Sequence, residues 1–393
     1  MKRTLEHLLI ILTISLVINA QQSMKNIEDQ IHEVKNSFAP DKRTAIFDLQ
    51  VAEEGGNYIL RGETNLPNAL DTLFKRLSGV KIEDEVKRLP DEILGEKSYG
   101  IVNISVANIR TKPEHSAEMA TQALLGTIVK IYKKTDDGWY LIQTPDNYIS
   151  WVDGDAIELV TLETADAWKN ENKVIFTRSY GSAFENSSPQ SGIVSDLVFG
   201  NILKLLSVKD DFYEVEFPDG RNAAIKQNEA EIFSDWVKSR QCSKENIIAT
   251  AKKFMGIPYL WGGTSTKGLD CSGFTKTVYF SNGVVLPRDA SQQVFVGELI
   301  NTEKDFSNLQ PGDLLFFGFS GNANRKERIT HVAVYLGEEE FIHSSGRVRI
   351  NSFNKSKTNF SKHRLSTFIR AKRIVTSVGQ KDVQPISSNP FYN

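Results

Sequence analysis

The chain has 393 residues, enough for two to four domains, and its 40% hydrophobic and 24% charged content is typical of globular proteins. Its formal net charge of −2 excludes nucleic-acid binding through an overall positive charge. The only cysteines in the sequence are Cys242 and Cys271, so a scaffold of several disulfides is also excluded.

The first 20 residues have the pattern of a signal peptide. Lys2 and Arg3 give a positive start, residues 8–18 form a short apolar run, and Ala20 is a small residue at the expected cleavage point. A buried N-terminal helix is the alternative, but the run has no amphipathic period. The run is short for a membrane span, and no cysteine follows it to carry a lipid. We therefore expect an exported, periplasmic protein without a stable membrane anchor.

A small α/β unit is predicted for residues 24–95. Its strands are expected at residues 44–51, 58–62 and 82–89. Between the second and third strands the sequence predicts a helix, with Asn65 as its cap and Pro67 in its first turn. Nothing in this unit points to catalytic chemistry.

Two regions of short strands and turns follow, at residues 97–160 and 170–238. The first resembles a bacterial SH3-like barrel. Residues 200–206 match residues 126–132, and a second pair of matching runs follows in the same order. This repetition indicates an internal duplication. A small antiparallel barrel of another type is the alternative.

The last domain is predicted at residues 241–375. It begins with a predicted helix that ends near Phe254, and Ser243 supplies a capping signal before the start of this helix. Residues 376–393 are rich in Ser, Pro, Gln and Asn, and we expect them to form a mobile tail.

Cys271 is the candidate nucleophile of this domain. It lies between a glycine-rich loop and an apolar stretch, residues 274–280, that reads as a helix. At a helix N-terminus the dipole and the free backbone N–H groups favour a thiolate, and they can also hold an oxyanion. A buried structural cysteine is the alternative for a cysteine taken alone.

Two histidines follow on consecutive predicted strands. His331 begins an apolar strand that runs to Leu336, and His343 lies on the next one. If these strands are adjacent and antiparallel, His331 can take the thiol proton while His343 orients it. A zinc site formed by Cys271 and the two histidines is the rival interpretation. Close-set ligand pairs are missing, so we predict no metal and no cofactor.

Five short motifs of this domain together resemble the NlpC family of bacterial cell-wall cysteine peptidases. They are residues 258–263 (Pro-Tyr-Leu-Trp-Gly-Gly), 270–274 (Asp-Cys-Ser-Gly-Phe), 286–288 (Leu-Pro-Arg), 309–317 (Leu-Gln-Pro-Gly-Asp-Leu-Leu-Phe-Phe) and 331–335 (His-Val-Ala-Val-Tyr). The resemblance implies that Cys271 is the nucleophile, His331 the base and His343 the third polar residue. The fold class it implies is α+β: a papain-like cysteine peptidase domain preceded by two SH3-like β-barrels and a small N-terminal α/β unit.

The whole chain is similar to the γ-D-glutamyl-L-diamino-acid endopeptidases, also called dipeptidyl-peptidase VI. That group cuts between γ-linked D-Glu and the diamino acid of murein stem peptides and prefers a free N-terminal L-Ala. The similarity implies substrate contacts from the first SH3-like unit and from the peptidase domain: Glu118, Tyr148, Tyr259, Trp261, Asp270, Ser272 and Asp289. Carboxylates in this set suit an ammonium ligand. Residues 318–328 depart from the family by being longer and more polar, which is consistent with a loop at the cleft.

The expected function is a cysteine endopeptidase that hydrolyses the γ-D-glutamyl–diamino acid bond of murein peptides in peptidoglycan turnover or recycling. A lytic endopeptidase on intact peptidoglycan, with the SH3-like units as wall-binding modules, is the alternative. A catalytically silent wall-binding protein conflicts with the intact Cys and His residues, and an acyltransferase on the same fold is a minor possibility. The expected partner is the peptide L-Ala-γ-D-Glu-diamino acid, with no nucleic acid and no obligate protein partner.

Overall fold

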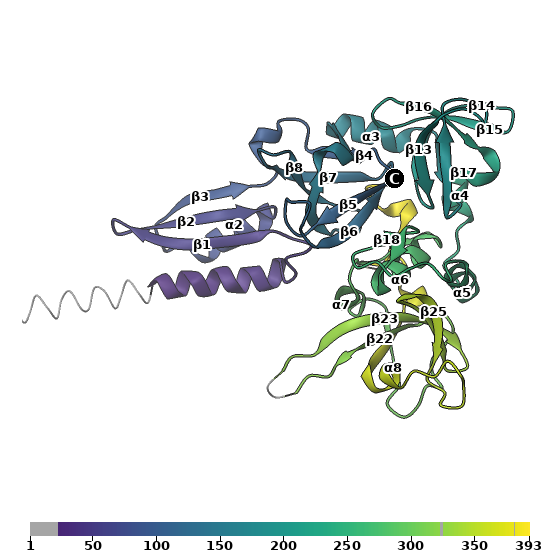
Figure 1. Ribbon diagram of the computed structural model, residues 1–393. Helices are drawn as coiled ribbons and strands as arrows, with labels where there is room; N and C mark the ends of the chain where they lie inside the picture. Colours follow the sequence, from purple (N-terminus) through teal and green to yellow (C-terminus); the bar gives the residue numbers. More distant parts are fainter. Residues whose placement is uncertain (1–22, 323–324, 381) are drawn as a thin grey trace, which may run out of the picture. The chain divides into compact units, whose positions relative to one another are not determined.

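The computed structural model describes residues 23–322, 325–380 and 382–393, and it divides into the units Met1–Gly95 and Glu96–Asn393 (Figure 1). The predicted signal peptide, residues 1–20, lies outside the described residues. Among the residues that are described, no helix is long and apolar enough to cross a membrane.

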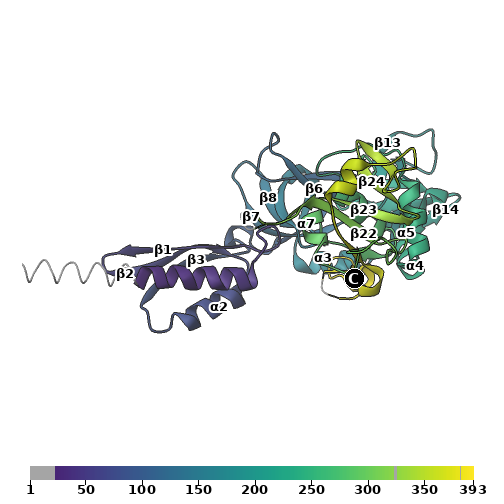
Figure 2. The same cartoon turned by 90° about the horizontal axis from the view of Figure 1, so that it is seen from below.

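The first unit is a three-stranded sheet with two helices on one face (Figure 2). Strands β1 (Phe47–Glu54) and β2 (Asn57–Thr64) form a hairpin, and β3 (Ile82–Arg88) pairs with β2 in parallel. The helices are residues 23–38 and α2 (Pro67–Arg76). Apolar side chains from both helices and the sheet form one core.

The predicted cap of α2 is wrong. Leu66, not Asn65, occupies the N-cap position, and no side chain caps the helix there. The Asn65 Oδ1 instead accepts the backbone N–H of Ile46 at 2.8 Å. A long-range bond to the start of the first strand has therefore replaced the local cap.

The two SH3-like units have the same topology, although their sequences match only weakly. The first contains β4 (Tyr99–Val102), β5 (Val106–Arg110), β6 (Met119–Leu124), β7 (Ile128–Lys134), β8 (Trp139–Gln143), β9 (Ile149–Asp153) and β10 (Ile157–Val160). The second contains β11 (Lys173–Phe176), β12 (Tyr180–Phe184), β13 (Ile193–Val198), β14 (Ile202–Lys209), β15 (Phe212–Glu216), β16 (Asn222–Lys226) and β17 (Ala230–Ile232). Their sheet orders are β10-β4-β7-β8-β9-β5-β6 and β17-β11-β14-β15-β16-β12-β13, which place corresponding strands at corresponding positions. A short helix follows each sheet, α3 (Leu162–Asn170) and α4 (Phe233–Ser239). The shared strand order favours the duplication inferred from the repeated runs.

The C-terminal domain packs helices against one six-stranded sheet, whose order is β21-β26-β22-β23-β24-β25. The strands are β21 (Glu298–Ile300), β22 (Leu314–Phe319), β23 (Arg328–Gly337), β24 (Glu340–Ser345), β25 (Arg347–Ser352) and β26 (Phe368–Arg373). The helices are α5 (Lys244–Lys253), α6 (Cys271–Phe280), α7 (Ala290–Gln293) and α8 (Lys362–Thr367). Ser243 caps α5 by accepting the N–H of Asn246 at 3.3 Å, as the sequence predicts. Helix α6 lies against β23 and β24, and this contact brings its first residue to the two histidine strands.

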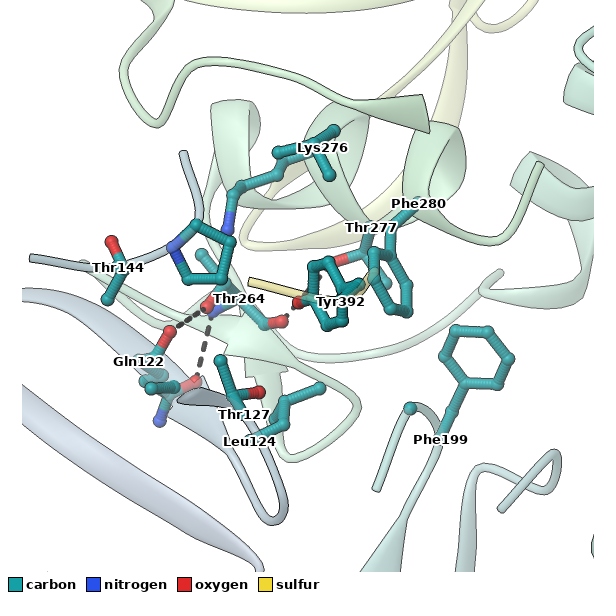
Figure 3. Close-up of a pocket in the computed structure, with 14 residues that line it drawn as sticks. Gln122, Leu124, Thr127, Thr144, Phe199, Thr264, Lys276, Thr277, Phe280 and Tyr392 are labelled. Atoms are coloured by element: carbon teal, nitrogen blue, oxygen red, sulfur yellow. Dashed lines mark hydrogen bonds between the residues drawn. The ribbon is translucent and has the colours of Figure 1, made fainter. Parts of the chain in front are cut away.

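The C-terminal segment, expected to be a mobile tail, packs on the rest of the second unit instead. Gln384 and Pro385 form β27, which pairs with β20 (Val284–Val285). Asn389 is fully buried and donates to the Pro145 carbonyl at 3.0 Å. The Tyr392 ring lies 5.8 Å from that of Phe280, beside a small cavity between the barrels and the peptidase domain (Figure 3). Polar composition suggested mobility, but a few buried side chains anchor the segment.

Candidate active site

Cys271 is the first residue of α6 and is buried, with 7% of its surface exposed. Asp270 caps the helix, and its Oδ1 accepts the N–H of Gly273 at 2.7 Å. Gly273 cannot carry a side chain, because an added Cβ would lie 2.0 Å from the Gly263 carbonyl oxygen. This close approach joins the start of the helix to the glycine-rich loop. The first-turn N–H groups of a helix have no acceptor within it, so the N–H of Cys271 is suited to an oxyanion.

The two predicted histidines meet on adjacent antiparallel strands. His331 Nε2 lies 2.7 Å from His343 Nδ1, and both rings are buried. His343 Nε2 lies 2.9 Å from Asn351 Oδ1 on β25. The relay His331–His343–Asn351 therefore runs across three neighbouring strands. It uses Nε2 of His331, so Nδ1 is the nitrogen that can serve the thiol.

A backbone carbonyl fixes the protons of this relay. Asn351 Nδ2 donates to the Asn359 carbonyl at 2.9 Å, so the Asn351 Oδ1 must be the atom that faces His343. His343 Nε2 must then be the donor, which leaves its Nδ1 as an acceptor. His331 Nε2 donates to that acceptor, and its own Nδ1 carries a lone pair. His331 is thus held in the tautomer that a general base requires.

Neither Cys271 nor His331 ionises easily alone. Burial raises the pKa of Cys271 to about 11, with the Asp270 carboxylate adding to the effect and the Val332 and Ser272 backbones opposing it. Burial also lowers the pKa of His331 well below its ordinary value, and the charge of Arg364 acts in the same direction. The backbone N–H of Ser272 at the start of α6 lowers the pKa of Cys271, as expected of a helix terminus, but burial outweighs this effect. A proton transfer from Sγ to Nδ1 creates both charges together, and each then stabilises the other.

Arg288 forms a buried ion pair beneath the nucleophile. Its side chain is 1% exposed, and Nη2 lies 2.5 Å from Asp270 Oδ2. Its Nη1 also donates to Ser272 Oγ at 3.0 Å, and its Nε donates to Thr121 Oγ1 of β6 at 2.9 Å. Burial opposes the charge, but Asp270 outweighs it and the pKa of Arg288 is raised. One guanidinium thus connects the helix cap, the residue after the nucleophile and the first SH3-like unit.

The edge of the first SH3-like unit runs along the loop that leads to Cys271. Gln122 accepts the Thr264 N–H at 3.0 Å through its side chain and the Thr264 hydroxyl at 3.1 Å through its backbone (Figure 3). Gly262 has φ +78°, and an added Cβ would lie 2.3 Å from the Met119 carbonyl oxygen. The SH3-like unit and the peptidase domain therefore form a close-fitting wall on this side of the site.

The predicted substrate residues fall into two groups. Glu118 and Trp261 lie at this wall, where Trp261 Nε1 donates to Glu118 Oε1 at 2.6 Å. Both side chains are exposed, so an incoming ligand can reach them. Asp289, the N-cap residue of α7, lies 3.9 Å from Arg288. The Tyr148 hydroxyl is electrostatically coupled to the same guanidinium.

Tyr259 borders the nucleophile itself. Burial raises its pKa, and the charges of Cys271 and Asp270 add to that effect, so the phenol keeps its proton and can donate it. Asp270 and Ser272, also predicted as substrate contacts, are buried in the network around Arg288. Their role in the structure is to hold the start of α6.

Three side chains around the site had no role in the prediction from sequence. Arg288 stood in a quoted motif but received no role, because its partner Thr121 lies 167 residues upstream. Asn351 gave no local signal. Arg364 lies on α8, where it influences the pKa of both catalytic histidines.

The zinc interpretation finds no support in the geometry. Within the described part of the chain, no three His, Cys, Asp or Glu side chains are grouped to hold a metal ion. Both ring nitrogens of His343 are engaged in the relay, with His331 and with Asn351, so His343 has no nitrogen left for an ion that it would share with Cys271. The second cysteine, Cys242, lies outside the site, and burial raises its pKa to about 12.

Residues 318–328, predicted as a loop at the cleft, begin within β22 and end at the first residue of β23. The pairing continues into it, since Gly318 faces Ile329 and Phe319 faces Arg328. The stretch is therefore partly an extension of the hairpin that carries His331.

A thiol at a helix N-terminus, with a base on the adjacent sheet that a second polar residue orients, defines a papain-like cysteine peptidase. The model of the NlpC/P60 family matches residues 256–370, and that of the bacterial dipeptidyl-peptidase SH3 domain matches residues 109–157. The chain belongs to the NlpC/P60 family of cysteine peptidases.

Several known proteins align with this chain over two thirds or more of their own length. A γ-D-glutamyl-L-lysine dipeptidyl-peptidase of Bacillus cereus is 33% identical over 58% of this chain and 67% of its own length. Dipeptidyl-peptidase 6 of Lysinibacillus sphaericus is 27% identical over 65% of this chain and 92% of its own. The crystal structure of an NlpC/P60 family protein from Bacillus cereus, 26% identical, superposes with a TM-score of 0.61 over 71% of this chain and all of its own.

Proposed function

We propose that this enzyme hydrolyses the bond between γ-linked D-Glu and the diamino acid of murein peptides that begin with a free L-Ala. The observation that carries the proposal is the wall formed by β6, which places the Glu118 carboxylate against Trp261 on the peptidase domain. An exposed carboxylate on the wall that holds the loop leading to the nucleophile suits a peptide with a free ammonium group. The name of the Bacillus cereus relative, a γ-D-glutamyl-L-lysine dipeptidyl-peptidase, supports the same substrate class. We further propose that the protein is exported and acts in the periplasm, in turnover or recycling.

The reaction follows from the protons of the relay. Cys271 Sγ gives its proton to His331 Nδ1 and attacks the γ-carbonyl carbon of D-Glu. The N–H of Cys271 and the Tyr259 phenol can donate to the resulting oxyanion. As the C–N bond breaks, His331 returns the proton to the leaving amine, which leaves a thioester. Water, deprotonated by His331, then hydrolyses the thioester and frees L-Ala-γ-D-Glu.

The test compares a free and an N-acetylated tripeptide, with release of the diamino acid read by mass spectrometry. Acetylation removes the charge that the carboxylates would meet and adds bulk at the wall. We expect it to cost about 2–5 kcal/mol, a factor of thirty or more in kcat/KM. Glu118→Gln keeps an acceptor for Trp261 but loses the charge, so it should slow only the free peptide.

Two variants control this experiment. Glu114→Gln removes a charge from an exposed residue of the same loop and should change neither rate, while Cys271→Ala should abolish both. Equal rates on the two peptides, or efficient release of peptides from intact sacculi, would favour the lytic alternative, with the SH3-like units as wall-binding modules.

A further inference from the structure

The catalytic imidazoles lie beside a group of cationic residues that no part of the reaction above uses. Arg364 on α8 places its guanidinium carbon 5.5 Å from the centre of the Phe317 ring, and that ring lies 5.8 Å from the His331 ring. Arg349 faces His343 across the β24–β25 pairing. His363 precedes Arg364 on the same helix and is also coupled to His331. The His331 side of the site is therefore rich in positive charge.

Among the described residues, Arg364 lacks the carboxylate partner that the buried Arg288 and the half-buried Arg373 have. Arg288 is paired with Asp270 and Arg373 with Asp313. Among the residues that the structure describes, no acidic side chain lies within ion-pair distance of Arg364, although its side chain is half-buried. Burial lowers the pKa of Arg364, and the like charge of Arg349 adds to that effect. Burying a guanidinium without a counter-ion is costly, so the arrangement fits a site that is completed by an anion.

The chemistry of the reaction indicates which anion this is. His331 Nδ1 must return its proton to the leaving amine, so the leaving residue sits at His331. In the proposed substrate this amine is the α-amino group of a diamino acid, and the α-carboxylate is attached to the same carbon. A diaminopimelate residue carries a second carboxylate at the end of its side chain. The Arg364 guanidinium stacks on the Phe317 ring next to His331, so it lies on the side of the site where this leaving amine is protonated.

We propose that Arg364 binds a carboxylate of the leaving residue, with Arg349 adding to the positive field, and so makes the enzyme selective for leaving residues with a free carboxylate. This inference rests on the proposed function. An arginine at this position recognises a planar carboxylate through two parallel hydrogen bonds. It also orients the leaving amine toward His331, so its effect extends to the chemical step.

The experiment uses the full-length enzyme and four peptides. The reference is L-Ala-γ-D-Glu-L-Lys with a free α-carboxylate, and the second peptide has that group as a carboxamide. The third carries meso-diaminopimelate with its α-carboxyl amidated, which leaves only the distal carboxylate. The fourth is L-Ala-D-isoglutaminyl-L-Lys, in which the D-Glu carboxylate is removed instead.

We expect the wild-type enzyme to cleave the reference peptide on the order of tenfold to a hundredfold more efficiently than its carboxamide. Arg364→Met should reduce this ratio to about one by slowing the reference peptide alone, and Arg364→Lys should retain part of it. Recovery of the rate by the third peptide would show that the distal carboxylate can replace the α-carboxylate at Arg364; a rate as low as the carboxamide's would show that only the α-carboxylate is bound. Lys362→Met, which removes an exposed charge from the same helix, is the matched control and should keep the wild-type ratio.

The outcomes separate the two proposals. If the wild-type enzyme cleaves none of the peptides, the proposed function is wrong. If it cleaves the acid and the carboxamide equally, or if Arg364→Met and Arg364→Lys fold as judged by their melting temperatures and keep the preference, the role of Arg364 is wrong and the proposed function stands. If Arg364→Met instead removes discrimination against the isoglutaminyl peptide, Arg364 contacts D-Glu and the inference is also overturned.

Discussion

Asn351 provides the most direct test of the proton relay. The variant Asn351→Asp keeps an oxygen facing His343 Nε2 but makes it part of a carboxylate. It also removes the side-chain N–H that residue 351 donates to the Asn359 carbonyl. A carboxylate in hydrogen-bond contact favours the doubly protonated, cationic form of His343. That form has a proton on Nδ1, so it cannot accept from His331 Nε2. His331 would then have to place its proton on Nδ1, and the base facing the thiol would be lost.

The size of the effect follows from the pKa of His343. Burial lowers this pKa to about 3, so in the wild-type enzyme the residue is neutral over the whole working range. An adjacent opposite charge raises a pKa by about 1–3 units, which would bring it to roughly 4–6 in Asn351→Asp. The protonated form is the inactive one, so activity is kept above the new pKa and lost as the pH falls through it. The acid limb of kcat/KM should therefore move upward.

The assay is a pH profile of peptide cleavage between pH 4 and 9. Asn351→Leu removes the acceptor without adding charge and should lower kcat by about tenfold or less, the worth of one hydrogen bond, without raising the acid limb. Asn354→Asp adds the same charge two residues beyond the strand and should leave the profile unchanged. An acid limb that does not move in Asn351→Asp, in a variant with the wild-type melting temperature, would refute the tautomer argument.

Two further predictions concern the nucleophile and its support. If the thiolate arises by proton transfer to His331, then His331→Ala should leave Cys271 with its pKa of about 11. Iodoacetamide labelling of Cys271 at pH 7 should then be roughly 300-fold slower than that of an ordinary thiol, and its rate should rise about tenfold per pH unit toward pH 11. Wild-type labelling rates in this variant, measured against Cys271→Ser to correct for Cys242, would contradict the transfer. Arg288→Met should lower the free energy of unfolding, measured in urea, by about 3–5 kcal/mol because it leaves Asp270 buried and unpaired. The double variant Arg288→Met with Asp270→Asn keeps the cap of α6 and should recover much of this loss. No recovery would show that the unpaired carboxylate is not the source of the destabilisation.

The sequence predicted those parts of the site that depend on local structure. A cysteine between a glycine-rich loop and an apolar helix can only be near the helix start, and two apolar strands joined by a short turn bring their histidines together. The parts it did not predict depend on distant segments. Asn351 becomes a relay residue because Asn359, on the following loop, fixes its amide orientation. Arg288 acquires its role from Thr121 in another domain.

The errors in the fold have the same origin. Asn65 is a residue type that often caps helices, but its side chain accepts a hydrogen bond from Ile46, almost twenty residues earlier at the start of the first strand. Residues 376–393 have the composition of a mobile tail, but Asn389 is buried and Tyr392 is half-buried against earlier parts of the chain. A local preference of about 1 kcal/mol is easily outweighed by a long-range contact that removes polar or aromatic groups from water.

Two opposing effects decide whether Cys271 ionises without a base: the helix terminus stabilises the thiolate, and burial destabilises it. A helix N-terminus stabilises a negative charge by about 0.3–1 kcal/mol, and by up to ~2 kcal/mol in partly buried positions. A pKa of about 11 corresponds to roughly 3 kcal/mol against the thiolate, relative to an ordinary thiol. Burial therefore outweighs the helix terminus, and the nucleophile requires a base held in one tautomer within the same buried site. The relay from Asn351 through His343 provides that base, which makes the orientation of a single amide a condition for catalysis.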